Sequence, residues 1–369
     1  MKNVGHQTPE ARPQTVPLLI VAATLFCMIL ATFIGGYVVG QQQANAATII
    51  AAQPTAAPST TSQPPTPMAP TDQAPAAALP AGTTGTVYPA YTFAKGEPTL
   101  PDGMRLATYT LDHGVKVFHL TASLIHWTTV KGQTFTAWAY NGTVPGPEIR
   151  VTEGDRVRVL VRNLLPEGTT VHFHGLFVPN DMDGVPMVTQ DPIKPGATFR
   201  YDFTAEPVGT HQYHSHMDDV KQVTSGLYGA FIVDPKRPIG HYDREFTLIP
   251  ADGMLGYIIN GKGFPDTTPL VVHLGDTVRI RMINMGDMYH PFHLHGFDFR
   301  EIAKDGLPIP EALQLGTNEI DAAPGGSYDM AFTANSLGVW AFHCHILDHV
   351  TGPNGEMAGM ITVVKVVPK

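Results

Sequence analysis

The chain has 369 residues, enough for roughly two or three domains, and only 15% of them are charged. The formal net charge of −9 argues against the basic surface that nucleic-acid binding requires, so no nucleic-acid partner is expected. The 36 glycines and 33 prolines favour a fold of short strands and many turns. Only two cysteines are present, Cys27 and Cys344, and the part after residue 40 therefore has one thiol and no intramolecular disulfide.

The first 40 residues predict a membrane-targeting segment. Residues 1–15 are polar, and residues 16–40 form an uncharged apolar run long enough to cross a bilayer as a helix. The positive residues Lys2 and Arg12 place the N-terminus in the cytoplasm and the bulk of the chain outside, in the periplasm or at the cell surface. Residues 44–46 read Ala-Asn-Ala and resemble a cleavage site, so a removed signal is the alternative to an uncleaved anchor.

Residues 41–100 are rich in Ala, Pro, Thr and Gln, a composition that predicts a disordered linker. From residue 101 the pattern changes to short alternating strands, such as those over 115–120 and 156–162. No long helical period follows. The sequence therefore predicts an all-β fold beyond the linker.

An internal repeat divides the β-rich part. Asp155 precedes the motif His-Phe-His-Gly, which begins at His172, by 17 residues, and Asp276 precedes His-Leu-His-Gly, which begins at His293, by the same 17. Two copies of one β-rich unit predict two similar sandwich domains, over residues 101–238 and 239–369.

Each copy of the repeat carries two His-x-His pairs. Both members of a pair on a strand face the same side, so one pair can reach adjacent metal ions. Four pairs at matching places are a strong signal, and eight imidazoles suit a cluster of three metal ions. The pairs are His172 and His174, His214 and His216, His293 and His295, and His343 and His345.

The stretch Phe-His-Cys-His-Ile-Leu-Asp-His over residues 342–349 joins this cluster to a second centre. Alternation along a strand points Cys344 to one side and its two neighbouring histidines to the other. A thiolate with imidazoles suits a blue copper site, which needs two histidines, one cysteine and usually a weak axial methionine. His349 follows Cys344 by five residues, and His290 precedes the nearest His-x-His pair.

These motifs, taken together, resemble the four copper motifs of multicopper oxidases, the laccase family. The resemblance rests on H-P-F-H-L-H-G, H-C-H-I-L-D-H, H-F-H-G and Y-H-S-H, and it covers roughly residues 101–369. It implies cupredoxin-like Greek-key β-sandwiches, and two of them make the chain similar to two-domain laccases. It also implies four copper ions, one of type 1, one of type 2 and two of type 3.

The resemblance assigns a role to each ligand. The type 1 copper takes His290, Cys344 and His349, and Cys344 passes its electrons on to the cluster. The remaining ligands are His172 and His293 for type 2, and His174, His214, His216, His295, His343 and His345 for the type 3 pair.

Two positions depart from the family pattern. The usual axial methionine lies five residues after the last histidine, where this chain has Asn354, and we expect Met357 to serve instead, with Met360 as the alternative. Asp183 matches an acidic position that relatives use near the cluster, so it is the expected proton donor; a turn-capping role is the alternative.

The resemblance also implies an assembly and a reaction. Two-domain relatives form a ring of three chains with each cluster between neighbouring subunits, so a homotrimer is expected. The expected reaction couples one-electron oxidations of a phenol, an aromatic amine or a metal ion to reduction of O2 to water. A copper nitrite reductase and a non-enzymatic electron-transfer or copper-holding cupredoxin are the alternatives. The first normally carries its blue-site cysteine in the first domain, and the four intact His-x-His pairs argue against the second.

Overall fold

The structure is a computed structural model that describes residues 88–89, 104–238 and 240–369. No helix within these ranges is long and apolar enough to cross a membrane. The expected cytoplasmic N-terminus (1–15), the apolar run (16–40) and nearly all of the expected linker (41–100) lie outside the described residues.

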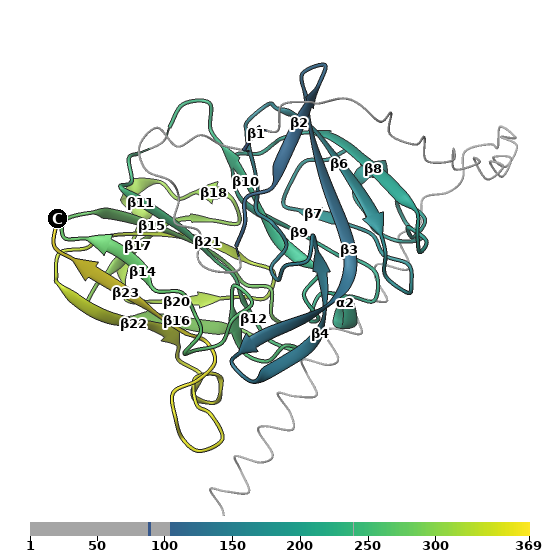
Figure 1. The fold of residues 1–369 in the computed structure, drawn as a ribbon. Helices are drawn as coiled ribbons and strands as arrows, with labels where there is room; N and C mark the ends of the chain where they lie inside the picture. Colours follow the sequence, from purple (N-terminus) through teal and green to yellow (C-terminus); the bar gives the residue numbers. More distant parts are fainter. Residues whose placement is uncertain (1–87, 90–103, 239) are drawn as a thin grey trace, which may run out of the picture. The chain divides into compact units, whose positions relative to one another are not determined.

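The described residues form an all-β fold, as predicted, in which two sheets pair into a sandwich twice along the chain (Figure 1). The first sandwich contains β1 (Tyr88–Pro89), β2 (Thr108–Asp112), β3 (Val115–Val130), β4 (Gln133–Tyr140), β5 (Ile149–Thr152), β6 (Arg156–Asn163), β7 (His172–His174), β8 (Thr198–Thr204), β9 (Gly209–His214) and β10 (Tyr228–Asp234). One of its sheets has the order β1-β2-β3-β6-β8 with β4 beside β3, and the other has the order β5-β10-β9-β7. Two short helices lie between strands of this sandwich, η1 (Asn180–Met182) and α2 (Asp219–Gln222).

The second sandwich repeats this arrangement. It contains β11 (Arg244–Leu248), β12 (Pro250–Ala251), β13 (Ile258–Ile259), β14 (Leu270–His273), β15 (Thr277–Ile283), β16 (His290–Leu294), β17 (Phe299–Lys304), β18 (Leu307–Pro308), β19 (Gly316–Thr317), β20 (Glu319–Ala322), β21 (Ser327–Thr333), β22 (Gly338–Cys344) and β23 (Ile361–Val367). Its main sheets have the orders β11-β15-β21-β17-β18, with β19 beside β17, and β14-β23-β22-β16-β20, while β12 pairs with β13 alone. Two short helices complete it, η2 (Glu311–Leu313) and η3 (Leu347–His349).

Each sandwich encloses one apolar core because its strands alternate buried and exposed side chains. In β6, Val157, Val159 and Val161 are buried in the first core, whereas Arg156 and Arg162 are exposed. The second core draws on both of its main sheets in the same way, and it includes the thiol-bearing Cys344 at the end of β22.

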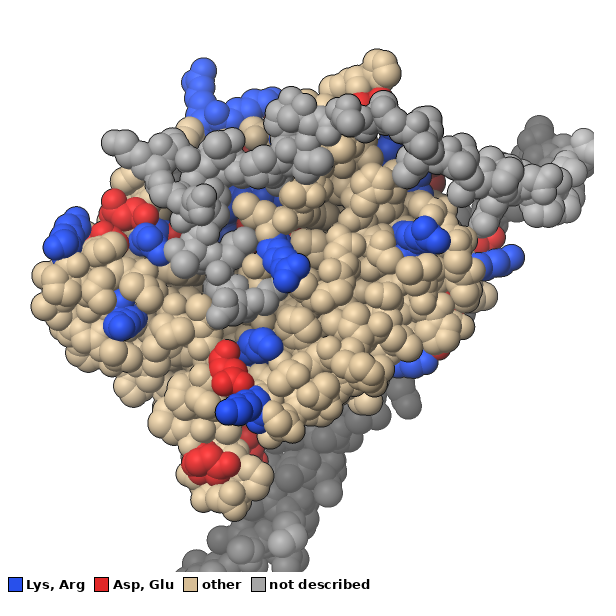
Figure 2. Space-filling model, in the orientation of Figure 1, with Lys and Arg blue, Asp and Glu red and all other residues tan. Residues whose placement is uncertain are grey.

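A third apolar cluster lies where the two sandwiches meet. It combines Val144 and Tyr228 of the first sandwich with Ile249 and Ile283 of the second. Burial of these side chains from both halves stabilises their contact. The outer surface is different: on the face drawn in Figure 2, charged side chains are scattered over a surface of mostly uncharged residues.

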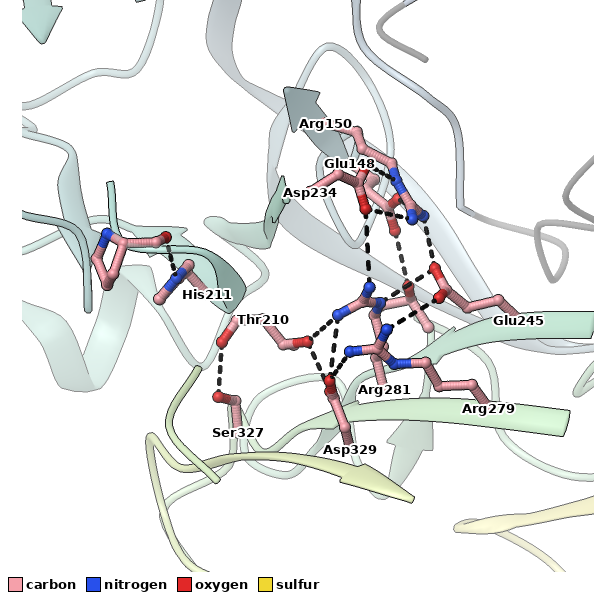
Figure 3. Close-up of polar contacts among 12 residues, drawn as sticks. Glu148, Arg150, Thr210, His211, Asp234, Glu245, Arg279, Arg281, Ser327 and Asp329 are labelled. Atoms are coloured by element: carbon pink, nitrogen blue, oxygen red, sulfur yellow. Dashed lines mark hydrogen bonds and ion pairs between the residues drawn. The ribbon is translucent and has the colours of Figure 1, made fainter. Parts of the chain in front are cut away.

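Buried charges also cross this junction (Figure 3). Arg150 of β5 donates to Asp234 of its own sandwich over 2.7 Å and pairs with Glu245 of the second sandwich over 2.7 Å. Burial raises the pKa of the adjacent Glu148, which accepts a hydrogen bond from Thr247 of the second sandwich.

Arg281 of β15 makes the corresponding contact from the second sandwich to the first. Its guanidinium donates to the Thr210 hydroxyl over 2.6 Å and pairs with Glu245 at 3.0 Å and with Asp329 at 3.2 Å (Figure 3). Asp329 also accepts from Thr210 over 2.6 Å and pairs with Arg279. Each charge is thus matched by opposite charges, the condition under which buried ions are tolerated.

Candidate metal centres

The first candidate centre lies between β16 and β22. The antiparallel register places Cys344 opposite Phe292, and the short helix η3 turns the chain back so that His349 returns to the thiol. The Cys344 Sγ lies 3.8 Å from His290 Nδ1 and 3.5 Å from His349 Nδ1, and the two nitrogens are 3.2 Å apart. All three side chains are buried. The structure therefore brings together the three residues that the motifs predicted, here called the thiol site.

The chemistry of the thiol site fits copper. Burial raises the pKa of the Cys344 thiol to about 11 and lowers the pKa of His349. Without metal the Cys344 thiol therefore keeps its proton at pH 7, and a bound cation would displace that proton. One sulfur and two imidazole nitrogens converging on one point form the donor set that copper prefers.

The methionines after His349 are placed differently from the expectation. The Met357 side chain is 57% exposed, whereas Met360 is fully buried in the core that contains Cys344. The Met360 carbonyl accepts the Cys344 amide over 3.1 Å, and the Met360 amide donates to the His349 carbonyl over 2.9 Å. The structure therefore buries Met360 in the core of the thiol site and leaves the expected Met357 largely exposed. The exposed turn over residues 352–355 accounts for the extra spacing.

A second group, the first histidine cluster, lies on β7 and β9. The register pairs His172 with His214, and ring nitrogens of His172, His174 and His214 all lie within 4.8 Å of one another. The ring of His216 lies 5.6 Å from that of His172, between ring centroids. All four predicted ligands of the first repeat are thus neighbours.

Backbone carbonyls fix the direction in which these rings present their nitrogens. His172 Nδ1 lies 2.8 Å from the Asp183 carbonyl, and His214 Nδ1 lies 2.7 Å from the Ser215 carbonyl. A carbonyl can only accept, so each Nδ1 carries the proton and each Nε2 keeps its lone pair for a metal ion. Burial lowers the pKa of His214 to about 3, which keeps this ring neutral. The Asp183 carboxylate is 3.3 Å from His172 Nδ1, beside the predicted ligand.

A third group, the second histidine cluster, lies on β16 and β22 beyond the thiol site. It contains His293, His295, His343 and His345, whose neighbouring ring centroids are 4.9–6.0 Å apart. His293 Nδ1 and His343 Nδ1 donate to backbone carbonyls in the same manner, over 2.9 and 2.7 Å. The Nε2 atoms of His295 and His343 face each other at 3.0 Å, a spacing that suits a shared ion or proton.

The two histidine clusters remain separate within one chain. In the described ranges, ring contacts join histidines within each cluster, and none joins a histidine of one to a histidine of the other. His295 and His345 are exposed, and His293 lines an open hollow on the surface. Within one chain, each histidine cluster therefore has only four of the eight imidazoles that the motifs predict for one metal cluster.

Two neighbours of the thiol site were missed by the sequence analysis. Asp252 accepts a hydrogen bond from His290 over 2.9 Å, and the ring of Tyr257 stacks on that of His349 with 4.1 Å between centroids. Neither belongs to a repeated motif, and each contact joins distant parts of the sequence. His211, which lies beside the first cluster, donates from Nε2 to the Pro207 carbonyl and is a satisfied core histidine.

Comparison with known proteins agrees with this donor set. Two family models, both described as multicopper oxidase, match residues 122–238 and 241–369. The copper resistance protein A homolog of Pseudomonas syringae pv. tomato is 36% identical over 161 residues, which are 43% of this chain and 25% of that protein. The chain spans less than half the length of the curated relatives it matches.

Solved structures match over a longer share of their length. The crystal structure of a blue copper oxidase from Nitrosomonas europaea is 34% identical with a TM-score of 0.65, covering 68% of this chain and 85% of that one. A copper nitrite reductase from the same organism is 26% identical with a TM-score of 0.59, covering 68% and 93%. The predicted resemblance is thereby confirmed, and the chain belongs to the multicopper oxidase family.

Proposed function

We propose that this chain is a laccase-like oxidase, which takes single electrons from a reducing substrate and delivers them to O2. The observation that carries the proposal is the place of Cys344 on β22. Its sulfur faces His290 and His349, while its two sequence neighbours, His343 and His345, belong to the second histidine cluster. One peptide bond on each side of Cys344 therefore links the thiol site to the second histidine cluster.

Copper, when bound, would supply the one-electron chemistry between the reductant and O2. Its type 1 site would be held by His290, Cys344 and His349, and we propose the buried Met360 rather than Met357 as the additional weak ligand. The proposed cluster ligands are His172 and His293 for a type 2 ion and His174, His214, His216, His295, His343 and His345 for a type 3 pair, which gives four ions per chain.

The chain's own groups orient these ligands. Backbone carbonyls hold the Nδ1 protons of His172, His214, His293 and His343, so that the Nε2 lone pairs are presented without reorganisation. The Asp183 carboxylate stands beside His172 and is the proposed proton donor when O2 is reduced. In its protonated form this carboxyl group could pass a proton on directly or through one water molecule, and it would then recover a proton from solvent.

We propose a homotrimer in which the first cluster of one subunit meets the second cluster of the next. The support is the separation of the two clusters within the chain and the exposure of His295 and His345. A cyclic arrangement would complete every cluster. The proposed domain boundary remains 238/239, and the apolar run over 16–40 is the proposed anchor or signal of an extracytoplasmic enzyme.

The reductant is proposed to be a phenol, an aromatic amine or a metal ion. Oxygen consumption and nitrite consumption by copper-loaded protein, measured side by side with such donors, test the proposal. We expect O2 uptake of one molecule per four electrons and no nitrite turnover. Nitrite turnover without O2 uptake would indicate a nitrite reductase, and copper reduction with neither would indicate an electron-transfer protein.

A further inference from the structure

The Asp252 side chain lies directly behind the thiol site. It follows β12, whose pairing with β13 fixes the start of the loop, and its carboxylate is buried. The Asp252 Oδ2 atom is 2.9 Å from His290 Nε2, the ring nitrogen that faces away from Cys344. This contact uses a residue 38 positions away from the histidine in sequence.

Backbone donors hold this carboxylate in place. The Asp287 amide donates to Oδ1 over 2.9 Å, and the Met288 amide donates to Oδ2 over 3.2 Å. Both oxygens thus already accept hydrogen bonds from the loop before His290. The carboxylate is anchored independently of the histidine, and an ionised carboxylate has no proton to donate, so the His290 Nε2 must be the donor.

The neighbouring Gly286 makes room for the contact. A Cβ atom at this position would lie 2.5 Å from Asp252 Oδ2 and 2.8 Å from His290 Nε2, closer than side-chain atoms approach one another. The loop before His290 therefore admits the carboxylate and the imidazole together only because residue 286 has no side chain.

We propose that Asp252 is a positioning residue that fixes the Nε2-protonated form of His290 and aims its Nδ1 lone pair at the thiol site. A carboxylate that accepts the N–H of a metal-bound imidazole also makes that imidazole a stronger donor. A stronger imidazole donor favours Cu(II) over Cu(I), so the carboxylate lowers the reduction potential of the site. The inference rests on the proposed copper site, and its first test is made without metal.

The first measurement is the tautomer of His290 in metal-free protein, read from long-range ¹H–¹⁵N correlations. We expect the proton on Nε2 in the wild type and a mixture of tautomers in Gly286→Ala, in which the added methyl displaces the contact. A proton on Nδ1 in the wild type would overturn the proposal. A fixed Nε2 tautomer in a protein that binds no copper would instead refute the proposed function and leave the positioning intact.

The second measurement is the reduction potential and Cu(II) affinity of the blue site in Asp252→Asn. Loss of a partner behind a ligand commonly weakens metal binding by about 10–100-fold. If Cu(II) binding weakens tenfold relative to Cu(I), the potential rises by about 59 mV. The matched control is Asp287→Asn, which removes the same charge from an exposed neighbour and keeps the backbone amide that Asp252 accepts.

We expect the control to keep the wild-type potential, whereas Asp252→Asn and Gly286→Ala both shift the potential upward. A potential unchanged in Asp252→Asn, or shifted equally in Asp287→Asn, would contradict the proposal. If Asp252→Asn does not fold, Gly286→Ala decides through the tautomer measurement, because it keeps the charge of Asp252 and places a methyl group against the Asp252–His290 contact.

Discussion

Replacing Arg281 with methionine tests whether the buried charges hold the two sandwiches together. The guanidinium lies between Glu245 and Asp329 and donates to Thr210 of the first sandwich. Methionine retains the apolar stem and removes the charge, so the two carboxylates lose a cation and Thr210 loses a donor. None of these residues belongs to the thiol site or to either histidine cluster.

The structure sets the size of the expected effect. Removing one partner of a buried ion pair costs about 3–5 kcal/mol, and the lower end applies here because Arg150 and Arg279 still face the same carboxylates. For a domain of 150–250 residues each kcal/mol lowers Tm by about 2–4 °C. We therefore expect a fall of roughly 6–12 °C in the thermal unfolding of metal-free protein, followed by circular dichroism.

The control for this experiment is Arg162→Met on the exposed face of β6, where loss of a charge should change the free energy of unfolding by less than about 0.5 kcal/mol. If Arg281→Met unfolds within about 2 °C of this control, the buried charges contribute no more than surface charges do. That result would refute the view that they join the halves.

Three further predictions concern acid stability, the second cluster and access to the thiol site. Burial raises the pKa of Glu245, but the charges of Arg281, Arg150 and Arg279 together lower it more, so the folded pKa lies well below its ordinary value. The ionised Glu245 carboxylate therefore stabilises the fold fully above about pH 4.3, and this stabilisation is lost progressively as the pH falls below that value. In acid titrations, Tm should decrease less steeply below about pH 4.3 in Glu245→Gln than in the wild type. His345→Ala should leave the blue band reducible by substrate under anaerobic conditions and abolish O2 uptake; undiminished uptake would contradict its place in the cluster. Tyr257→Ala should remove about 0.5–1.5 kcal/mol of stacking between this ring and His349. Because His349 is only 1% exposed beneath the tyrosine ring, the variant should also speed the reduction of the blue band by bulky donors, measured by stopped-flow. Unchanged rates would show that electrons reach His349 from another side.

The histidine clusters could be predicted from sequence because strand alternation alone places both members of a His-x-His pair on one face. The same alternation separates Cys344 from its two neighbours, and β22 has this arrangement. The axial methionine was harder, since Met357 and Met360 differ only in spacing from His349, and the turn that decides between them is irregular.

The contacts of Asp252 and of the junction could not be predicted for a different reason. Asp252, in the loop after β12, meets His290 at the start of β16, and Arg150 of the first sandwich meets Glu245 of the second. Such partners are determined by how whole sheets pack against one another. A charged residue in a short strand gives the same alternation of polar and apolar residues whether its side chain faces water or a buried partner. The periodicity of a sequence predicts which face of the sheet a side chain lies on, but it does not identify the partner that the side chain contacts.

Copper analysis of the wild type and of Cys344→Ser tests the central claim most directly. We expect four copper ions per chain in fully loaded wild-type protein, with an intense blue band that requires the cysteine thiolate. The variant should lose one ion, the blue band and turnover, and it should keep the three ions of the histidine clusters. A wild type that binds far fewer than four ions, or a variant that keeps the blue band, would contradict the account.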